Sequence, residues 1–218
     1  MDVKRVLQLT DHTLLRVGCT EKEVAQACED AVACHCAAVC VPPCFNSFAK
    51  ECIAGRGVKV CAAVGFPNGY NTTQVKVAET EDAIANGADE IDMVINMSFV
   101  KDGEWDKVRE EIDLIRKVSE GHILKVIVET CLLTEEEKIK LCRIVTECGA
   151  DFIKTSTGFS SGGATVADVV LFRKHIGPEV QIKAAGGIHT IEEAQAMIDA
   201  GASRIGTSSI VKAAKEIK

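Results

Sequence analysis

Two similar stretches, Asp151-Phe-Ile-Lys154-Thr-Ser-Thr-Gly158 and Val180-Gln-Ile-Lys183-Ala-Ala-Gly-Gly187, each run from apolar residues through a lysine into a loop of small residues. The pattern predicts two short strands with an ammonium group at each carboxyl end. Burial disfavours the charged form of lysine, and a second ammonium nearby disfavours it further, so one of the two should be partly neutral near pH 7. A neutral lysine is a nucleophile for carbonyl groups. The alternative, for either lysine alone, is a side chain that closes its strand and reaches into water.

The rest of the chain repeats this arrangement. Short apolar runs alternate with helical periods along all 218 residues, which predicts parallel strands joined by crossover helices. Eight such units predict an α/β fold, a closed (β/α)8 barrel in one domain over residues 1–218. An open doubly wound sheet is the alternative, but it would need a glycine-rich dinucleotide turn that the sequence lacks. The expected strands are 6–9, 37–41, 58–64, 90–95, 124–129, 152–155, 180–184 and 204–206.

Helix starts and helix faces can also be placed. Three capping boxes set a threonine three residues before a glutamate: Thr20 with Glu23, Thr134 with Glu137, and Thr190 with Glu193. Two apolar stripes with helical spacing are predicted to face the sheet. They are Trp105, Val108, Ile112 and Ile115, and Leu141, Ile144, Val145 and Cys148.

Composition narrows the class of protein. The net charge of −7 is spread through the helical segments without a basic cluster, which argues against a nucleic-acid partner. No apolar run reaches the roughly 18 residues of a membrane span, and residues 1–5 are expected to lead into a strand rather than a signal sequence. Eleven cysteines, an odd number, indicate reduced thiols. We therefore expect a cytoplasmic protein without membrane contact.

A metal site is not expected. Cys34-His35-Cys36 lies close to Cys40 and Cys44, but the group lacks paired C-x2-C spacing, and residues 37–41 read as a buried strand. The histidines at positions 12, 122, 175 and 189 are scattered without ligand spacing. Core and hydrogen-bonding roles are sufficient for these residues.

Polar side chains gather where a barrel would place its active site, at the carboxyl ends of the strands. Alternation along Ile91-Asp92-Met-Val-Ile-Asn96 puts Asp92 on the face opposite Ile91. A carboxylate amid a barrel strand needs a partner, and a lysine ammonium is the obvious one. A structural ion pair with Lys125 is the alternative to catalysis. Lys125 itself is interpreted as structural, because it lies near the amino end of its strand.

The last two strands are followed by small-residue turns. Gly186-Gly187 follows the seventh expected strand, and Gly206-Thr-Ser-Ser209 follows the eighth. Both turns open onto helix starts, where free backbone N–H groups attract phosphate. Because this is the usual phosphate position of the fold, the pair of turns predicts a phosphorylated ligand.

The chain strongly resembles the deoxyribose-phosphate aldolase family, class I Schiff-base aldolases with a (β/α)8 barrel. The resemblance covers nearly the whole length. It is carried by Leu9-Thr-Asp-His-Thr-Leu14, Val39-Cys-Val-Pro42, Val64-Gly-Phe-Pro-Asn-Gly69, Glu90-Ile-Asp-Met-Val-Ile-Asn96, Lys125-Val-Ile-Val-Glu-Thr130, Phe152-Ile-Lys-Thr-Ser-Thr-Gly158, Ile182-Lys-Ala-Ala-Gly-Gly-Ile188 and Arg204-Ile-Gly-Thr-Ser-Ser209.

The resemblance implies reversible cleavage of 2-deoxy-D-ribose 5-phosphate into acetaldehyde and D-glyceraldehyde 3-phosphate, without cofactor or metal, by a homodimer or larger homo-oligomer. Lys154 then resembles the Schiff-base lysine, Lys183 the second lysine whose charge lowers the pKa of Lys154, Asp92 the acid/base carboxylate, and Asp11 an orienting acid near Lys183. Residues that would line the phosphate are Gly158, Gly186, Gly187, Gly206, Ser208 and Ser209. Some relatives finish in a tyrosine tail; this chain stops at Lys218 and its one tyrosine is Tyr70, so that tail's role is expected to be absent or replaced.

Other readings of the residues remain open. A transaldolase-like Schiff-base enzyme or a phosphosugar isomerase could use the same barrel. An isomerase would need a carboxylate base without a lysine nucleophile. A catalytically silent phosphosugar-binding protein is a third possibility, against which the intact Lys154, Lys183 and Asp92 argue.

Overall fold

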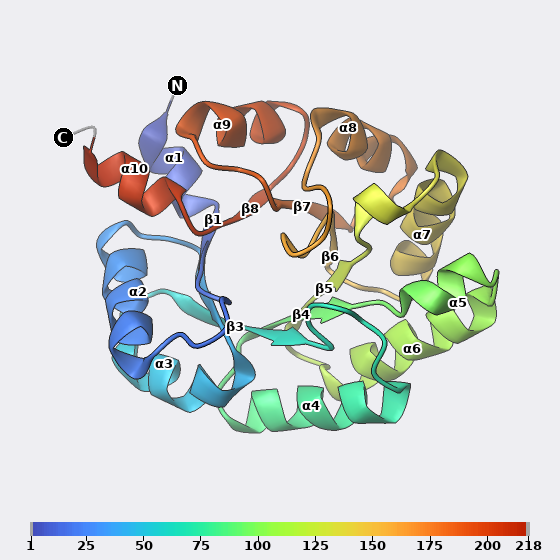
Figure 1. Ribbon diagram of the computed structural model, residues 1–218, viewed down its shortest axis with the longest axis horizontal. Coiled ribbons are helices and arrows are strands. Elements are labelled where there is room, and N and C mark those ends of the chain that lie inside the picture. Colours follow the sequence, from blue (N-terminus) through green and yellow to red (C-terminus); the bar gives the residue numbers. More distant parts are fainter. Residues whose placement is uncertain (1, 217–218) are drawn as a thin grey trace.

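The eight parallel strands close into a barrel, with neighbours in chain order from β1 to β8 and β8 paired back onto β1 (Figure 1). This closed barrel confirms the (β/α)8 prediction. The computed structural model describes residues 2–216, and side chains to residue 214. Lys218, where the tail of some relatives would follow, lies outside the described residues. The strands are Thr10–Thr13, Ala38–Val41, Lys59–Val64, Glu90–Val94, Ile123–Ile127, Phe152–Lys154, Gln181–Ala185 and Arg204–Thr207.

Helices form the outer ring of the barrel (Figure 1). None of those described is long and apolar enough to cross a membrane. In chain order α1 to α10 are Val3–Gln8, Glu21–Ala33, Asn46–Cys52, Thr73–Ala85, Met97–Lys101, Trp105–Val118, Glu135–Glu147, Val166–His175, Ile191–Asp199 and Ile210–Glu216, with short 3-10 turns at Pro43–Phe45 and Thr130–Leu132.

The prediction of a strand at residues 6–9 is wrong. Residues 6–9 belong to α1 and its end, and β1 begins only at Thr10. Asp2 starts this helix, since its side chain accepts the Arg5 N–H at 3.1 Å, and Val6 is fully buried. As a consequence, Asp11 lies inside β1 rather than after it, paired in register with Ala38 and Gly206.

The other seven expected strands are present, with ends that differ by one or two residues. The largest difference is at β5, which stops at Ile127, whereas the expected strand ran to Glu129. In the register, Lys154 of β6 lies opposite Lys183 of β7, and Asp92 of β4 lies opposite Lys125 of β5. These pairings bring the charged residues together inside the barrel.

Local signals read from the sequence are confirmed. All three capping boxes are formed, at the starts of α2, α7 and α9. The two apolar stripes pack against the sheet in the main hydrophobic core, in which Trp105 is only partly buried. A second apolar cluster, including Val24, Val39 and Val60, lies under α2 and α3.

A buried ion pair fixes the end of β4 from outside the barrel. Lys76 of α4 and Glu111 of α6 are fully buried, and the Lys76 Nζ donates to Glu111 Oε1 and to the Val94 carbonyl, each at 2.8 Å. The other Glu111 oxygen accepts the Asn96 N–H at 2.9 Å. Burial lowers the pKa of Lys76 and raises that of Glu111, against their mutual attraction. Desolvation thus outweighs pairing, so the pair holds the strand end rather than adding net stability.

We predict that Glu111→Leu lowers the free energy of unfolding by about 3–5 kcal/mol, because it leaves the Lys76 ammonium buried without a carboxylate. The double variant Lys76→Met/Glu111→Leu should recover most of that loss, since it removes both buried charges. Urea unfolding of the parent and both variants at pH 7 measures this. A double variant as unstable as the single one would contradict the prediction.

Candidate active site

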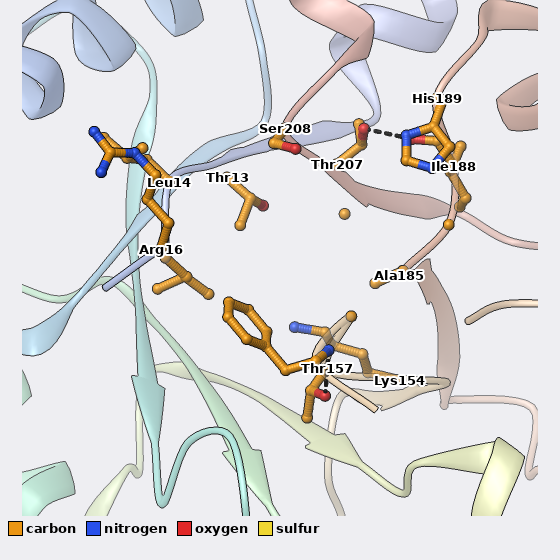
Figure 2. A pocket seen from close by; sticks show the side chains of 16 residues that line it. Thr13, Leu14, Arg16, Lys154, Thr157, Ala185, Ile188, His189, Thr207 and Ser208 are labelled. Atoms are coloured by element: carbon orange, nitrogen blue, oxygen red, sulfur yellow. Dashed lines mark hydrogen bonds between the residues drawn. The ribbon is translucent and has the colours of Figure 1, made fainter. Parts of the chain in front are cut away.

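A cavity of about 290 Å³ opens at the carboxyl end of the barrel, on the side of β1, β6, β7 and β8. Lys154 points into it from one wall, with Ser208 and His189 on the opposite wall (Figure 2). Lys154 ends β6, and its side chain is only 5% exposed. The lysine is therefore nearly dehydrated but open to a ligand in the cavity.

Asp92 lies at the centre of a buried ionic network, and its two oxygens have different partners. Oδ2 accepts from Lys154 Nζ at 2.7 Å and from Lys183 Nζ at 2.6 Å. Oδ1 accepts from Lys125 Nζ at 2.7 Å and from the Cys61 thiol at 3.1 Å. The two lysines singled out from the sequence thus share one carboxylate oxygen, and the period-two alternation placed Asp92 on the correct face.

The two carboxylate oxygens of Asp11 also have different partners. Its Oδ2 contacts Lys183 Nζ, and its Oδ1 accepts from Arg204 at 2.6 Å. Burial opposes ionisation of Asp11, but the charges of Lys183, Lys125 and Arg204 outweigh it and lower its pKa to about 2. Asp11 therefore stabilises the fold above about pH 4, and this contribution is lost as the pH falls toward 2. The contact expected between Asp11 and Lys183 is present.

Lys125 belongs to the same ionic network, as a buried partner of Asp92 away from the cavity wall. It does form the structural ion pair with Asp92 that was considered, and it also contacts Glu90 at 2.6 Å. The side chain of Lys125 is long enough to reach Asp92 on the neighbouring strand. Lys125 nevertheless lies below the cavity rather than on its wall.

The charges in this network do not cancel if every group is ionised. Among the described residues, its ion pairs join four cations, Lys125, Lys154, Lys183 and Arg204, with three carboxylates, Asp11, Glu90 and Asp92. The balance becomes neutral when one cation loses its proton. Lys154 has a single carboxylate partner and faces the cavity, so it is the amine whose charge is least compensated.

The other lysines are held charged. Burial disfavours the Lys183 ammonium, but Asp11 and Asp92 outweigh it and raise the pKa of Lys183. The pKa of Lys125 is likewise raised by Asp92 and its other anionic neighbours, against burial. Burial also opposes ionisation of Asp92, yet the three lysines lower its pKa well below the usual range. The geometry thus sets the amine of Lys154, at the cavity wall, beside the Lys183 cation and the Asp92 carboxylate.

The expected phosphate residues lie mostly on the cavity wall. Gly158, Gly186, Gly187, Gly206 and Ser208 line it, whereas Ser209 lies beside it with its hydroxyl 3.4 Å from His189 Nδ1. Gly158 and Gly186 have φ of 84° and 83°, which only glycine adopts easily. A Cβ on Gly186 would lie 3.1 Å from the Gly158 Cα. The two turns therefore approach each other without room for side chains.

Several cavity residues were missed by sequence reasoning. Arg16, Thr157, Phe159 and His189 also line the wall. The Phe159 ring, 52% exposed, meets Phe66 edge-on at 5.3 Å between centroids. Thr157, Phe159 and His189 carried a usable signal, since each follows an expected strand end by two to five residues. Arg16 lies seven residues beyond the expected end of the first strand, too far for the same argument.

The thiols do not form the cluster that was considered for zinc. None of the eleven cysteines, all within the described residues, is joined in a disulfide. Among described residues, the groups with metal-like spacing are Cys40, Cys61 and Asp92, and Asp11, Cys61 and Glu90. Both sets lie within the ionic network, where lysine and arginine nitrogens already contact the carboxylates. A further cation fits these positions poorly.

Comparison with known proteins gives one consistent result. The family model described as DeoC/LacD family aldolase matches residues 5–212. A deoxyribose-phosphate aldolase of Streptococcus pyogenes is 54% identical over 99% of this chain and 96% of its own. Among solved structures, the aldolase QR15 is 41% identical with a TM-score of 0.92, covering 97% of this chain and 96% of its own. The tetrameric deoxyribose phosphate aldolase of Aeropyrum pernix is 28% identical, with a TM-score of 0.89 and 100% and 94% coverage. The chain therefore belongs to the DeoC/LacD family of aldolases.

Proposed function

We propose that this protein is a deoxyribose-phosphate aldolase that reversibly cleaves 2-deoxy-D-ribose 5-phosphate into acetaldehyde and D-glyceraldehyde 3-phosphate. The observation that carries the proposal is the shared contact of Lys154 and Lys183 with Asp92 Oδ2. Lys154 would be the nucleophile, because it faces the cavity and has the fewest carboxylate partners. The names of the relatives support the choice of substrate.

The reaction begins at the aldehyde carbon C1. The neutral Lys154 amine attacks C1, the carbonyl oxygen leaves as water, and an iminium ion forms. Removal of the C3 hydroxyl proton then breaks the C2–C3 bond, and its electron pair moves into the iminium to give an enamine while D-glyceraldehyde 3-phosphate departs. Protonation of C2 and hydrolysis release acetaldehyde and restore Lys154. Asp92, or a water bound to it, would move these protons, with Lys183 supplying a fixed positive charge.

The phosphate group would lie at the opposite side of the cavity from Asp92. We assign Gly158, Gly186, Gly187, Gly206, Ser208 and Ser209 to this end of the substrate. Glycine turns let backbone N–H groups come close to phosphate oxygens, and serine hydroxyls add donors.

Three further features belong to this proposal. We infer that residues 1–218 act as one aldolase domain and that the protein works in the cytoplasm, where its eleven thiols would stay reduced. We also infer a homo-oligomer, a dimer or larger, for which the tetrameric relative gives support.

We predict that borohydride reduction in the presence of acetaldehyde traps a covalent adduct on Lys154. The position of this amine, beside Asp92 and open to the cavity, is the physical reason. Peptide mapping by mass spectrometry locates the adduct. An adduct on Lys183 alone would reverse the two roles, and no adduct under turnover conditions would favour an isomerase or a silent phosphosugar-binding protein.

We predict that Lys183→Leu lowers activity near pH 7 by about a hundredfold, because neighbouring charges change protonation equilibria by about one to three orders of magnitude. Without the Lys183 cation, the three remaining cations of the network would be balanced by its three carboxylates, and the surplus positive charge around Lys154 would be lost. Activity should recover partly at alkaline pH.

Full pH–rate profiles of the parent, Lys183→Leu and Lys183→Arg test this, the arginine variant retaining a cation. If the leucine profile only scales down without an alkaline shift, Lys183 acts by binding substrate or moving protons instead.

We predict full activity after exhaustive EDTA treatment, because lysine and arginine nitrogens contact the carboxylates that could otherwise bind a metal. The cleavage rate before and after dialysis is the measurement. Loss of turnover that added zinc or magnesium restores would place the enzyme in a metal-dependent class.

A further inference from the structure

Glu129 is a buried carboxylate that the reaction above does not use. It follows β5 by two residues, is 5% exposed, and has a left-handed backbone with φ of 52°. Such a conformation costs a residue with a Cβ of order 1–3 kcal/mol and persists only where the surroundings enforce it. The conformation therefore calls for a local cause.

The backbone on either side of Glu129 shows that cause. The Val128 N–H donates to the Lys154 carbonyl at 3.0 Å, and the Thr130 N–H donates to the Thr155 carbonyl at 2.9 Å. These two bonds span two residues on the β5 side but only one on the β6 side, so Glu129 is an extra residue in a local bulge. The bulge ties this segment to the main chain of the proposed Schiff-base lysine.

The bulge directs the Glu129 side chain to the turn after Lys154. The Thr157 N–H lies 3.3 Å from each Glu129 oxygen, and the Thr157 hydroxyl donates to Oε2. The Thr157 Oγ1 in turn accepts the Phe159 N–H at 3.1 Å (Figure 2). One carboxylate thus fixes both residues that flank Gly158.

Gly158 must be placed accurately to fit its neighbour. It lines the cavity, and the backbones of Gly158 and Gly186 approach so closely that a Cβ on Gly186 would lie 3.3 Å from the Gly158 nitrogen. The loop after this turn lies against Cys131, whose Cβ is 2.9 Å from where a Cβ on Gly162 would be. The segment from Glu129 to Cys131 therefore contacts both the Thr157–Phe159 turn and the loop that follows it.

We propose that Glu129 is a positioning residue that holds the Thr157–Phe159 turn against the Gly186–Gly187 turn and so sets the affinity for the phosphate end of the substrate. The inference rests on the proposed function, and it gives a role at the phosphate end to Glu129, which lies in the quoted stretch Lys125–Thr130 but was assigned no role there. Because Lys154 is held separately by Asp92, loss of the Glu129 contacts should weaken phosphate binding more than bond cleavage.

The test compares two aldehydes in the synthetic direction with acetaldehyde: D-glyceraldehyde 3-phosphate and unphosphorylated D-glyceraldehyde. In Glu129→Gln, KM for the phosphorylated aldehyde should rise about tenfold, the effect of weakening a charge-assisted hydrogen bond, with kcat within about twofold. For D-glyceraldehyde, kcat/KM should stay within about twofold of the parent. Glu129→Gly should give the same phosphate-selective loss while relieving the left-handed backbone.

Glu79→Gln is the matched control. The Glu79 carboxylate also accepts a backbone N–H just after a strand, that of Gly65 at 2.7 Å, but it does not contact the Thr157–Phe159 turn. The control should leave the ratio of kcat/KM for the two aldehydes unchanged.

Equal losses on both aldehydes in Glu129→Gln would overturn the inference and show that Glu129 acts on Lys154 instead. Unchanged kinetics in both Glu129 variants would overturn it as well. If the parent itself forms no imine and condenses neither aldehyde, the proposed function fails, and the inference with it; an active parent with non-selective variants refutes the inference alone.

Discussion

The structure depends on one buried carboxylate shared by three lysines. Asp92 is fully buried, and an unpaired charge there would be prohibitive, so the lysines of β5, β6 and β7 must converge on it. Strands that are three positions apart in a flat sheet could not bring their side chains to one point. A closed barrel can, because its strands face a common axis. The ionic network and the barrel closure therefore require each other.

The cations of the network fall into two groups with different roles. Lys125 and Arg204, the lower cations, lie away from the cavity, whereas Lys154 lines it and Lys183 lies beside Lys154. Asp11 and Asp92 each give one oxygen to a lower cation, Arg204 or Lys125, and the other to the buried Lys183. The same Asp92 oxygen also contacts Lys154, which lines the cavity. The lower cations fix the orientation of each carboxylate before any substrate arrives. Such preorganisation avoids the cost of reorienting charges during the reaction.

Sequence reasoning located what periodicity and spacing encode. Seven strands, three capping boxes and the Asp92–Lys154–Lys183 group follow from alternation and from strand-end positions. Residues 6–9 were misread because four consecutive residues fit both a strand and a short helix, and only the Asp2 cap decides between them. Glu129 was assigned to the fifth strand, which ends at Ile127, for another reason. A left-handed backbone is a three-dimensional feature that leaves no periodic pattern in the sequence.

Carboxylates recur at the carboxyl ends of the strands as acceptors for backbone N–H groups. Glu79 accepts from Gly65 after β3, Glu111 from Asn96 after β4, and Glu129 from Thr157 after β6. Where a strand leaves the sheet, its N–H groups lose their acceptors on the neighbouring strand, and a buried donor must find another. A carboxylate from a surrounding segment supplies a strong one. Of these three loops, the one after β6 lines the cavity, so Glu129 is the acceptor that helps to fix the shape of the glycine-containing turn there.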